Sequence, residues 1–120
     1  LPVLRVLVGG QALPVTERER AARLGLSIVR TYGSAETAGG VVYDGRAVGA
    51  TRVASFDGVI HVSGPTLSDG YWGEPGRTEQ AFPIIDGVRW YRTQDSGSVV
   101  DGVLTVTGRI DDVIVTGGVK

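Results

Sequence analysis

Cysteine and methionine are both absent from this chain of 120 residues, and histidine occurs once, at His61. Without cysteine the chain can form no disulfide, offers no thiolate nucleophile and provides no cysteine ligand for a metal. A single histidine excludes a histidine metal cluster and argues against a Ser-His-Asp triad. Because methionine is missing, we expect that Leu1 is not a translation start and that the chain is an internal fragment of a longer protein.

An excess of charge of one sign and long apolar runs are also lacking. The formal net charge is −1, so there is no basic field for a nucleic-acid partner or a membrane surface. No apolar run approaches bilayer length and no signal-peptide pattern begins the sequence. We therefore expect a cytoplasmic protein without membrane insertion, and a homo-oligomer is compatible with this composition. Hydrophobic residues at 42% and charged residues at 21% are typical of a globular domain.

Residues 1–46 carry the pattern of an α/β layer. The apolar run at 4–8 is followed by two glycines, as expected of a buried parallel strand, and a second apolar run lies at 26–29. Between them are the start and stop signals of a helix: Thr16 can cap a helix that begins at Glu17, with Glu19 reaching back as in a capping box, and Gly25 is a natural stop. Strand, helix and strand predict a βαβ unit.

After residue 46 the pattern changes to short apolar or alternating segments separated by turns. These segments lie at residues 48–54, 59–62, 88–92, 97–100 and 103–106. Asp57-Gly58 and Asp101-Gly102 indicate tight type I′ hairpins, which need positive φ at both central positions. One short helix is expected at 77–81. The fold class is therefore α/β followed by β, with a βαβ subdomain leading into a small distorted β-barrel.

The segment around Tyr32 could form one part of a nucleotide site. A strand that ends in Tyr32-Gly33 lets an aromatic ring lie flat while the backbone approaches a ligand. Glu36 is a hard oxygen ligand of the kind that Mg²⁺ accepts beside nucleotide phosphates. By itself this segment is better explained by a hairpin tyrosine and a solvated glutamate.

Asp95 and Arg109 could supply two further parts of such a site. Asp95 follows a strand whose end would present its carboxylate to ribose hydroxyls, although a plain turn aspartate is the simpler alternative. Arg109 follows Gly108 at the end of another strand and has the planar fork that recognises phosphate. Its simpler alternative is a surface salt bridge with Asp111 or Asp112.

Taken in order, these motifs resemble those of the adenylate-forming acyl-CoA ligases. The family pattern Tyr-Gly-x-Thr-Glu is matched at 32–36, Gly-Pro-x-x-x-x-Gly-Tyr-Trp at 64–72, Trp-x-Arg-Thr-Gly-Asp at 90–95 and Gly-Arg-x-Asp-Asp at 108–112. Upstream, residues 8–14 are similar to the family's glycine turn. Single motifs of this length misfire often, but an ordered series over the whole chain is specific.

The resemblance implies a role for each matching residue. Glu36 and Arg109 would be catalytic, Glu36 as the Mg²⁺ ligand; Tyr32 would stack on adenine, and Asp95 would hold the ribose. The full set expected at ATP or the acyl-adenylate is Gly10, Gln11, Ala12, Thr31, Tyr32, Gly33, Ser34, Ala35, Asp95 and Arg109. Asp111 would be the hinge of a small C-terminal domain, so the implied division is 1–46, 47–109 and 110–120. ATP, Mg²⁺, coenzyme A and a small carboxylic acid would be the ligands.

The sequence departs from the family pattern at three positions. Ala35 replaces a threonine, so a hydroxyl contact to phosphate is lost or supplied by Ser34 or Thr37. Gln94 replaces the glycine before Asp95. In the strand before Gly64, Val59 occupies a position where glutamate is common in the family. Within the family, the chain looks most like the short actinobacterial o-succinylbenzoate–CoA ligases of menaquinone biosynthesis.

Other interpretations stay open. The acid could be a fatty or aryl acid, or an amino acid loaded by an adenylation enzyme. The chain could instead be a non-catalytic module that binds a nucleotide or a partner, in which case Glu36, Asp95 and Arg109 need not converge. The family's phosphate loop and adenylating lysine are not in the sequence, so we expect this fragment alone to be inactive. Tyr71 and Trp72 are expected to be packing groups.

Overall fold

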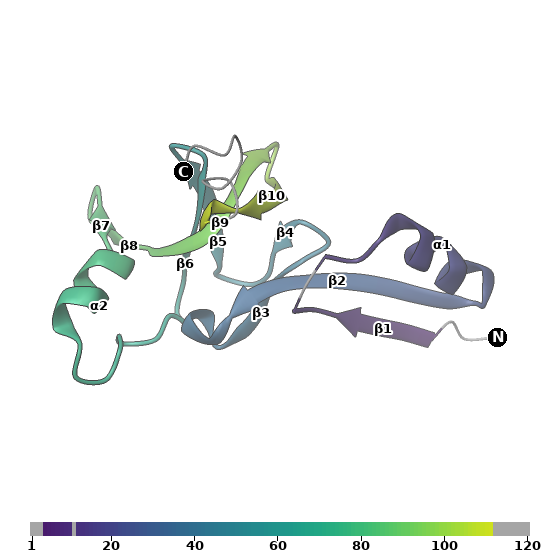
Figure 1. Cartoon of the computed structure of the whole chain (residues 1–120), viewed down its shortest axis with the longest axis horizontal. Helices are drawn as coiled ribbons and strands as arrows, with labels where there is room; N and C mark the ends of the chain where they lie inside the picture. The colour runs from purple at the N-terminus through teal and green to yellow at the C-terminus, as the bar shows by residue number, and fades with distance from the viewer. Residues whose placement is uncertain (1–3, 11, 112–120) are drawn as a thin grey trace.

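The computed structural model describes residues 4–10 and 12–111, and these form two four-stranded sheets joined by a shared core, together with one two-stranded sheet. The first sheet has the strand order β1-β2-β3-β4, and the second has the order β10-β9-β6-β5. A two-stranded ribbon, β7-β8, lies with the helix α2 at one end of the molecule, and α1 lies at the other (Figure 1). The predicted class, α/β followed by a curled β-sheet, is confirmed.

The first sheet begins with the predicted βαβ unit. Strand β1 (Leu4–Val8) and strand β2 (Leu26–Ser34) run parallel, with Leu4 opposite Leu26, and α1 (Val15–Arg23) connects them. The expected Thr16 cap is wrong, because the helix starts earlier and its N-cap is Pro14, whose carbonyl accepts the first N–H groups. Gly25, at φ +83°, ends the helix as predicted.

Strand β2 is much longer than predicted and changes partners along its length. Its first half pairs with β1, and its second half pairs antiparallel with β3 (Gly39–Tyr43), which forms a hairpin with β4 (Arg46–Ala47). A bulge between Tyr32 and Gly33 interrupts the second pairing. At Gly33 a Cβ atom would lie 1.9 Å from the carbonyl oxygen of Gly39, so only glycine permits this close approach. The η1 turn (Ala35–Thr37) links β2 to β3.

The second sheet is antiparallel throughout. It consists of β5 (Arg52–Phe56), β6 (Val59–Ser63), β9 (Tyr91–Val100) and β10 (Val103–Arg109). The two hairpins predicted from Asp-Gly pairs are confirmed, with Asp57 at φ 54° and Asp101 at φ 53°. The segments expected at 88–92 and 97–100 are not separate strands of this sheet. Residues 91–100 form one continuous strand, β9, and residues 88 and 89 belong to the ribbon.

The connection between β6 and β9 forms a small unit of its own. The predicted short helix is present as α2 (Pro75–Ala81), and β7 (Ile84–Ile85) and β8 (Val88–Arg89) form a hairpin after it. Trp72, expected to be a packing group, is fully exposed at 100%, so that expectation is wrong.

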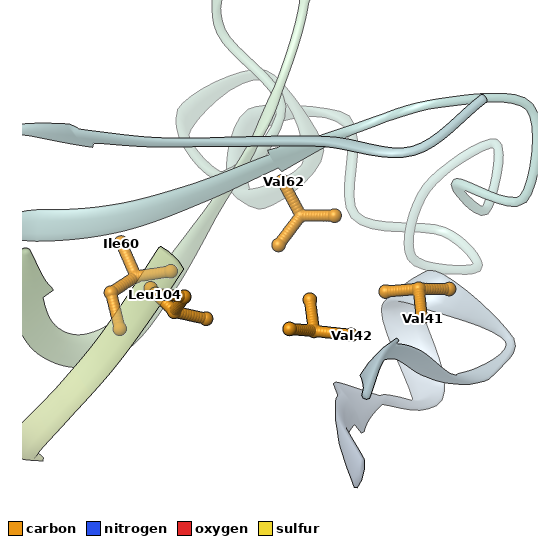
Figure 2. Close-up of a cluster of buried hydrophobic side chains, with 5 residues drawn as sticks. All are labelled: Val41, Val42, Ile60, Val62 and Leu104. Atoms are coloured by element: carbon orange, nitrogen blue, oxygen red, sulfur yellow. The ribbon is translucent and has the colours of Figure 1, made fainter. Parts of the chain in front are cut away.

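The core joins the two sheets. Five buried aliphatic side chains meet between β3, β6 and β10: Val41, Val42, Ile60, Val62 and Leu104 (Figure 2). The backbone N–H of Leu104 also donates to the carbonyl oxygen of Gly45 at 2.7 Å, which ties β10 to the turn after β3. Tyr32 packs against this core from β2. The junction therefore holds the C-terminal half of β2 against the second sheet.

No helix in residues 4–10 and 12–111 is long and apolar enough to cross a bilayer.

Candidate functional site

Three of the predicted site residues meet where the two sheets join. Tyr32 on β2 donates a hydrogen bond from Oη to Oδ2 of Asp95 on β9, at 2.5 Å. Arg109 ends β10 and lies opposite Asp95 in the β9–β10 register. Its Nη1 is 3.7 Å from Oδ1 of Asp95. An aromatic ring, a carboxylate and a guanidinium thus converge from three strands.

Asp95 does not lie at a strand end, as expected, but inside β9. Because β9 continues past it to pair with β10, the carboxylate is presented from the middle of a strand. Thr93 fixes the local backbone, since its Oγ1 accepts the N–H of Asp95 at 3.1 Å and donates to the carbonyl oxygen of Ile60 at 2.8 Å. The Asp95 side chain is 20% exposed, so it is held firmly yet accessible.

The environment of Tyr32 keeps its phenol protonated. Burial raises the pKa of Tyr32 well above its usual range, and the hydrogen bond to Asp95 raises it further. A phenol that stays neutral remains a donor to the carboxylate at any physiological pH. The bond to Asp95 therefore persists wherever Asp95 is ionised.

Glu36 lies in a second cluster, formed around the η1 turn. Its Oε2 accepts a hydrogen bond from the Tyr71 hydroxyl at 2.7 Å, and its backbone carbonyl accepts the N–H of Ser68 at 2.9 Å. Burial alone would raise the pKa of Glu36, but hydrogen bonds, led by that of Tyr71, lower it below its ordinary value. Glu36 is therefore ionised at neutral pH, and one of its carboxylate oxygens is fixed by Tyr71.

The role of Tyr71 is one that sequence reasoning missed. Tyr71 does pack, with its ring centroid 6.0 Å from that of Phe82, but its hydroxyl also orients Glu36. The two residues are 35 positions apart, and no spacing rule connects them. The only available signal was the recurrence of Gly-Tyr-Trp in the family pattern, which gives no partner for the tyrosine.

A polar cavity of about 320 Å³ opens in front of Glu36. Its lining comes from η1, the loop before α2, α2 itself and β9: Glu36, Tyr71, Arg77, Gln80, Ala81, Tyr91, Arg92 and Gln94. Gln94, which departs from the family pattern, is part of this wall and directly precedes Asp95. The two clusters are therefore neighbours along β9. Asp95 and Arg109 are in contact, while Glu36 lies beside them rather than touching them.

Ser34 and Thr37 differ sharply as substitutes for the hydroxyl missing at Ala35. Thr37 is 1% exposed, and its hydroxyl accepts the N–H of Ser34 at 2.9 Å and donates to the carbonyl oxygen of Gly39 at 2.8 Å. That hydroxyl is fully used in holding the turn. By contrast, Ser34 Oγ is buried and makes no close hydrogen bond among the described residues, and its hydroxyl helps to lower the pKa of Glu36.

The remaining predicted residues lie around the ends of β1 and β2. Thr31 Oγ1 donates to the carbonyl oxygen of Val8 at 3.4 Å, and Gly10, at φ +93°, turns the chain after β1. Gly10, Ala12, Gly33 and Ala35 are all exposed. Gln11 lies outside the described residues.

The expected hinge can be described only at its start. Asp111 is exposed and accepts a hydrogen bond at Oδ1 from Nε of Arg109, at 3.3 Å. Arg109 therefore makes both the expected surface pair and the contact to Asp95. Residues 112–120, which include the rest of the predicted hinge segment, lie outside the described part of the chain.

Sequence comparison finds relatives of two kinds. One kind matches about half of this chain: a D-alanine–D-alanyl carrier protein ligase of Bacillus anthracis is 50% identical over 54 residues, covering 45% of this chain and 11% of that protein. The other kind matches nearly the whole chain. The chain is 40% identical over 117 residues to a probable 2-succinylbenzoate–CoA ligase of Mycobacterium tuberculosis, covering 94% of this chain and 29% of that protein. It is 29% identical over 121 residues to the 2-succinylbenzoate–CoA ligase of Escherichia coli K12, covering 94% and 26%. The chain thus spans less than a third of the length of these relatives. No family model matches the sequence.

Solved structures of two kinds share the fold. Wild-type E. coli MenE, bound to an analogue of OSB-AMS, superposes with a TM-score of 0.73 at 30% identity, over 89% of this chain and 25% of that one. The nonribosomal peptide synthetase FmoA3 superposes with a TM-score of 0.82 at 26% identity, over 91% of this chain and 15% of that one. Each match covers about nine tenths of this chain.

Proposed function

We propose, from the premise that this chain belongs to the adenylate-forming superfamily, that its residues form part of an ATP-dependent acid–CoA ligase. One observation carries the proposal. Tyr32, Asp95 and Arg109 come together at the sheet junction as a ring, a carboxylate and a guanidinium. These are the groups that adenine, ribose and phosphate require.

Each residue of the junction has a proposed role toward ATP. Asp95 accepts hydrogen bonds from the ribose hydroxyls, and Arg109 contacts ribose or the α-phosphate. Tyr32 presents its ring to adenine while its hydroxyl holds Asp95 in place. Residues 10–12 and 31–35 line the acyl-adenylate, and Ser34 directly precedes Ala35, where the family has threonine.

Glu36 fits Mg²⁺ as a single carboxylate ligand. Mg²⁺ at nucleotide sites is commonly held by one or two carboxylates together with phosphates and water. Glu36 is ionised and has one oxygen fixed by Tyr71, which leaves the other oxygen for a metal. No group of three or more acidic or histidine side chains that could hold a metal occurs in the described residues, so a metal here depends on the nucleotide. When bound, Mg²⁺ would neutralise phosphate charge.

The reaction has two steps. A carboxylate oxygen of the acid attacks the α-phosphorus of ATP, which forms an acyl-adenylate and expels pyrophosphate. The thiol of coenzyme A then attacks the acyl carbonyl and expels AMP. Arg109 stabilises negative charge in the first step, and such preorganised contacts supply much of the rate enhancement in group transfer. A hinge at Asp111 would let a small C-terminal domain turn between the steps.

The acid that we propose is o-succinylbenzoate, in menaquinone biosynthesis. The proposal is supported by relatives of that name at 40% and 29% identity. A second candidate is an amino-acid adenylation enzyme, which is favoured by the higher TM-score to a nonribosomal peptide synthetase, 0.82. An enzyme that uses ATP and coenzyme A works where both are made, so we propose a cytoplasmic location. The division into 1–46, 47–109 and 110–120 stays a prediction.

The test is acid-dependent pyrophosphate release by the full-length gene product. The acids are o-succinylbenzoate, benzoate, a medium-chain fatty acid and mixed amino acids, and Glu36→Ala is the inactive control. Release with o-succinylbenzoate alone supports the proposed acid, while release with amino acids alone supports the second candidate. Silence with every acid in a folded protein contradicts the ligase proposal. The isolated 120 residues should give no turnover above the Glu36→Ala control.

A further inference from the structure

Tyr71 projects from a loop between β6 and α2 that contains no helix or strand of its own. Its hydroxyl nevertheless donates to Oε2 of Glu36 at 2.7 Å, across 35 residues of sequence. A loop residue keeps such a partner only where neighbouring elements restrain its backbone, because ordering an irregular segment costs conformational entropy. In the structure, α2 and β8 restrain this loop at two points next to Tyr71.

Thr78 holds the loop from α2. Its Oγ1 accepts the backbone N–H of Tyr71 at 2.8 Å, and its side chain is half-buried. Gly70 allows this approach, because a Cβ atom there would overlap Cγ2 of Thr78, and the φ of +145° is one that other residues rarely adopt. The threonine hydroxyl therefore fixes the backbone from which the Tyr71 side chain projects.

Arg89 holds the same loop from β8. Its Nη2 donates to the carbonyl oxygen of Asp69 at 3.3 Å, two residues before Tyr71. The guanidinium also lies over the Phe82 ring, 4.3 Å from the ring centroid. The Arg89 backbone is anchored in turn, since its carbonyl oxygen accepts a hydrogen bond from Ser63 Oγ on β6 at 2.8 Å. Arg89 therefore ties the loop to the second sheet.

Aromatic and cationic contacts add support to the Tyr71 ring itself. The Arg77 guanidinium lies 4.0 Å from the centroid of this ring, and the centroid of the Phe82 ring lies 6.0 Å from it. Phe82 is 5% exposed, and its ring centroid lies 5.4 Å from that of Tyr91 on β9. These contacts restrict the ring, whereas the two hydrogen bonds to the loop restrict its backbone.

We propose that Thr78 and Arg89 are positioning residues for the adenylation step. Neither is among the residues that line the cavity in front of Glu36, so both act through Tyr71. The inference rests on the proposed function, in which Glu36 is the protein ligand of nucleotide-bound Mg²⁺. Loss of either restraint lets the loop shift and leaves the Glu36 carboxylate without a fixed direction. A misplacement of about 1 Å at a reacting centre can cost about a hundredfold in rate.

Acid-dependent exchange of pyrophosphate into ATP, followed against Mg²⁺ concentration in the full-length protein, tests the role of Thr78. Thr78→Val keeps the side-chain shape but removes the acceptor for the Tyr71 N–H. The Mg²⁺ concentration for half-maximal exchange should therefore rise by about tenfold, with KM for the acid unchanged. Thr78→Ser retains the hydroxyl and should restore most of the wild-type value. Thr105→Val, at an exposed threonine on β10, is the matched control and should behave like the wild type.

The same assay tests Arg89. Arg89→Gln removes both the donor to the Asp69 carbonyl and the cation over Phe82, so it should raise the half-maximal Mg²⁺ concentration in the same direction. Arg20→Gln, at an exposed arginine on α1, is its control and should have no effect.

A double-mutant cycle shows whether Thr78 acts through Tyr71. In a Tyr71→Phe background the hydroxyl that orients Glu36 is already absent, so adding Thr78→Val should change the half-maximal Mg²⁺ concentration by less than about twofold. A full tenfold effect in that background overturns the proposal, as does wild-type behaviour of Thr78→Val or a Thr78→Ser variant as impaired as Thr78→Val. Each of these results leaves the proposed function standing. A folded wild-type protein that exchanges pyrophosphate with none of the acids refutes the proposed function and this inference with it.

Discussion

Tyr32 Oη lies 2.5 Å from Asp95 Oδ2, although 63 residues separate the two in the chain. The bond connects β2 of the first sheet with β9 of the second, directly beside the core that joins them. The carboxylate proposed to hold ribose is therefore oriented by the ring proposed to meet adenine. Assembly of the site depends on the packing of one sheet against the other.

Removing the Tyr32 hydroxyl should weaken ATP binding while leaving the ring in place. In Tyr32→Phe, Asp95 loses a buried donor, so we expect KM for ATP to rise by about tenfold, the effect of one hydrogen bond to a charged group. Tyr43→Phe is the matched control, since Tyr43 is 38% exposed on β3. Steady-state kinetics of the full-length protein provide the measurement. Equal KM values in the two variants would show that the hydroxyl does not act on the site.

The Tyr71–Glu36 bond should set the acid limb of activity. The hydrogen bond from Tyr71 lowers the pKa of Glu36 against the opposing effect of burial, so Tyr71→Phe should raise that pKa. Protonated Glu36 cannot bind Mg²⁺, and the acid limb of kcat/KM should therefore move to higher pH. A profile of kcat/KM against pH tests this, and an unmoved acid limb contradicts it.

The same bond has a consequence for stability. Because the pKa of Glu36 is lower in the folded than in the unfolded protein, its ionisation stabilises the fold above the unfolded-state pKa, and this contribution is lost as pH falls through the folded-state pKa. The stability difference between the wild type and Glu36→Gln should accordingly shrink under acid conditions. Urea unfolding at pH 7 and at pH 3 measures it. A difference that grows on acidification would reverse the sign of the assigned shift.

Gly33 should tolerate no side chain. A Cβ atom there would lie 1.9 Å from the carbonyl oxygen of Gly39, so Gly33→Ala must separate β2 from β3. We expect a loss of about 3 kcal/mol or more in the free energy of unfolding. Gly76→Ala is the control, because Gly76 lies in α2 with open space at its Cβ position, and alanine favours helix by about 0.5–1 kcal/mol. Chemical denaturation of both variants decides; equal stabilities would mean that the strands are not packed this closely.

The hydroxyls of Ser34 and Thr37 should behave in opposite ways. Ser34 Oγ is buried with no close hydrogen bond in the described residues and only helps to lower the pKa of Glu36, so Ser34→Ala should cost little stability. Thr37→Val, nearly equal in shape, leaves the Ser34 N–H without its acceptor and should cost about 1–3 kcal/mol. Thermal unfolding distinguishes the two. A cost for Ser34→Ala that matched that of Thr37→Val would reveal a partner for Ser34.

Local signals predicted the parts of the fold that local chemistry controls. The strand at β1, the glycine after α1 and the two Asp-Gly hairpins were all predictable, because each depends on a few consecutive residues. The expected burial of β1 is wrong, since Leu4 and Leu7 are exposed. Strand β2 was predicted too short because its second half pairs with β3 across a bulge, which depends on Gly33 meeting Gly39. Helix α1 starts earlier than predicted because Pro14, and not Thr16, is its N-cap.

The site was predictable as a set of residues but not as an arrangement. Ordered motifs identified Tyr32, Asp95 and Arg109, and the structure brings these three together. The partners of Glu36 were missed because Tyr71 reaches it from a loop 35 residues away. Contacts of this kind arise from tertiary packing, for which neither composition nor periodicity carries a signal.

The most direct test of the account is acid-dependent exchange of labelled pyrophosphate into ATP, comparing Asp95→Asn with Asp101→Asn in the full-length protein. Both changes remove one carboxylate, but Asp95 belongs to the site, whereas Asp101 lies at an exposed hairpin turn with φ 53°, a conformation that asparagine accepts. The account predicts a loss of about a hundredfold in exchange activity for Asp95→Asn and near wild-type activity for Asp101→Asn. Equal activity in the two variants, with both folded, would contradict the assignment of Asp95 to the nucleotide and with it the proposed site.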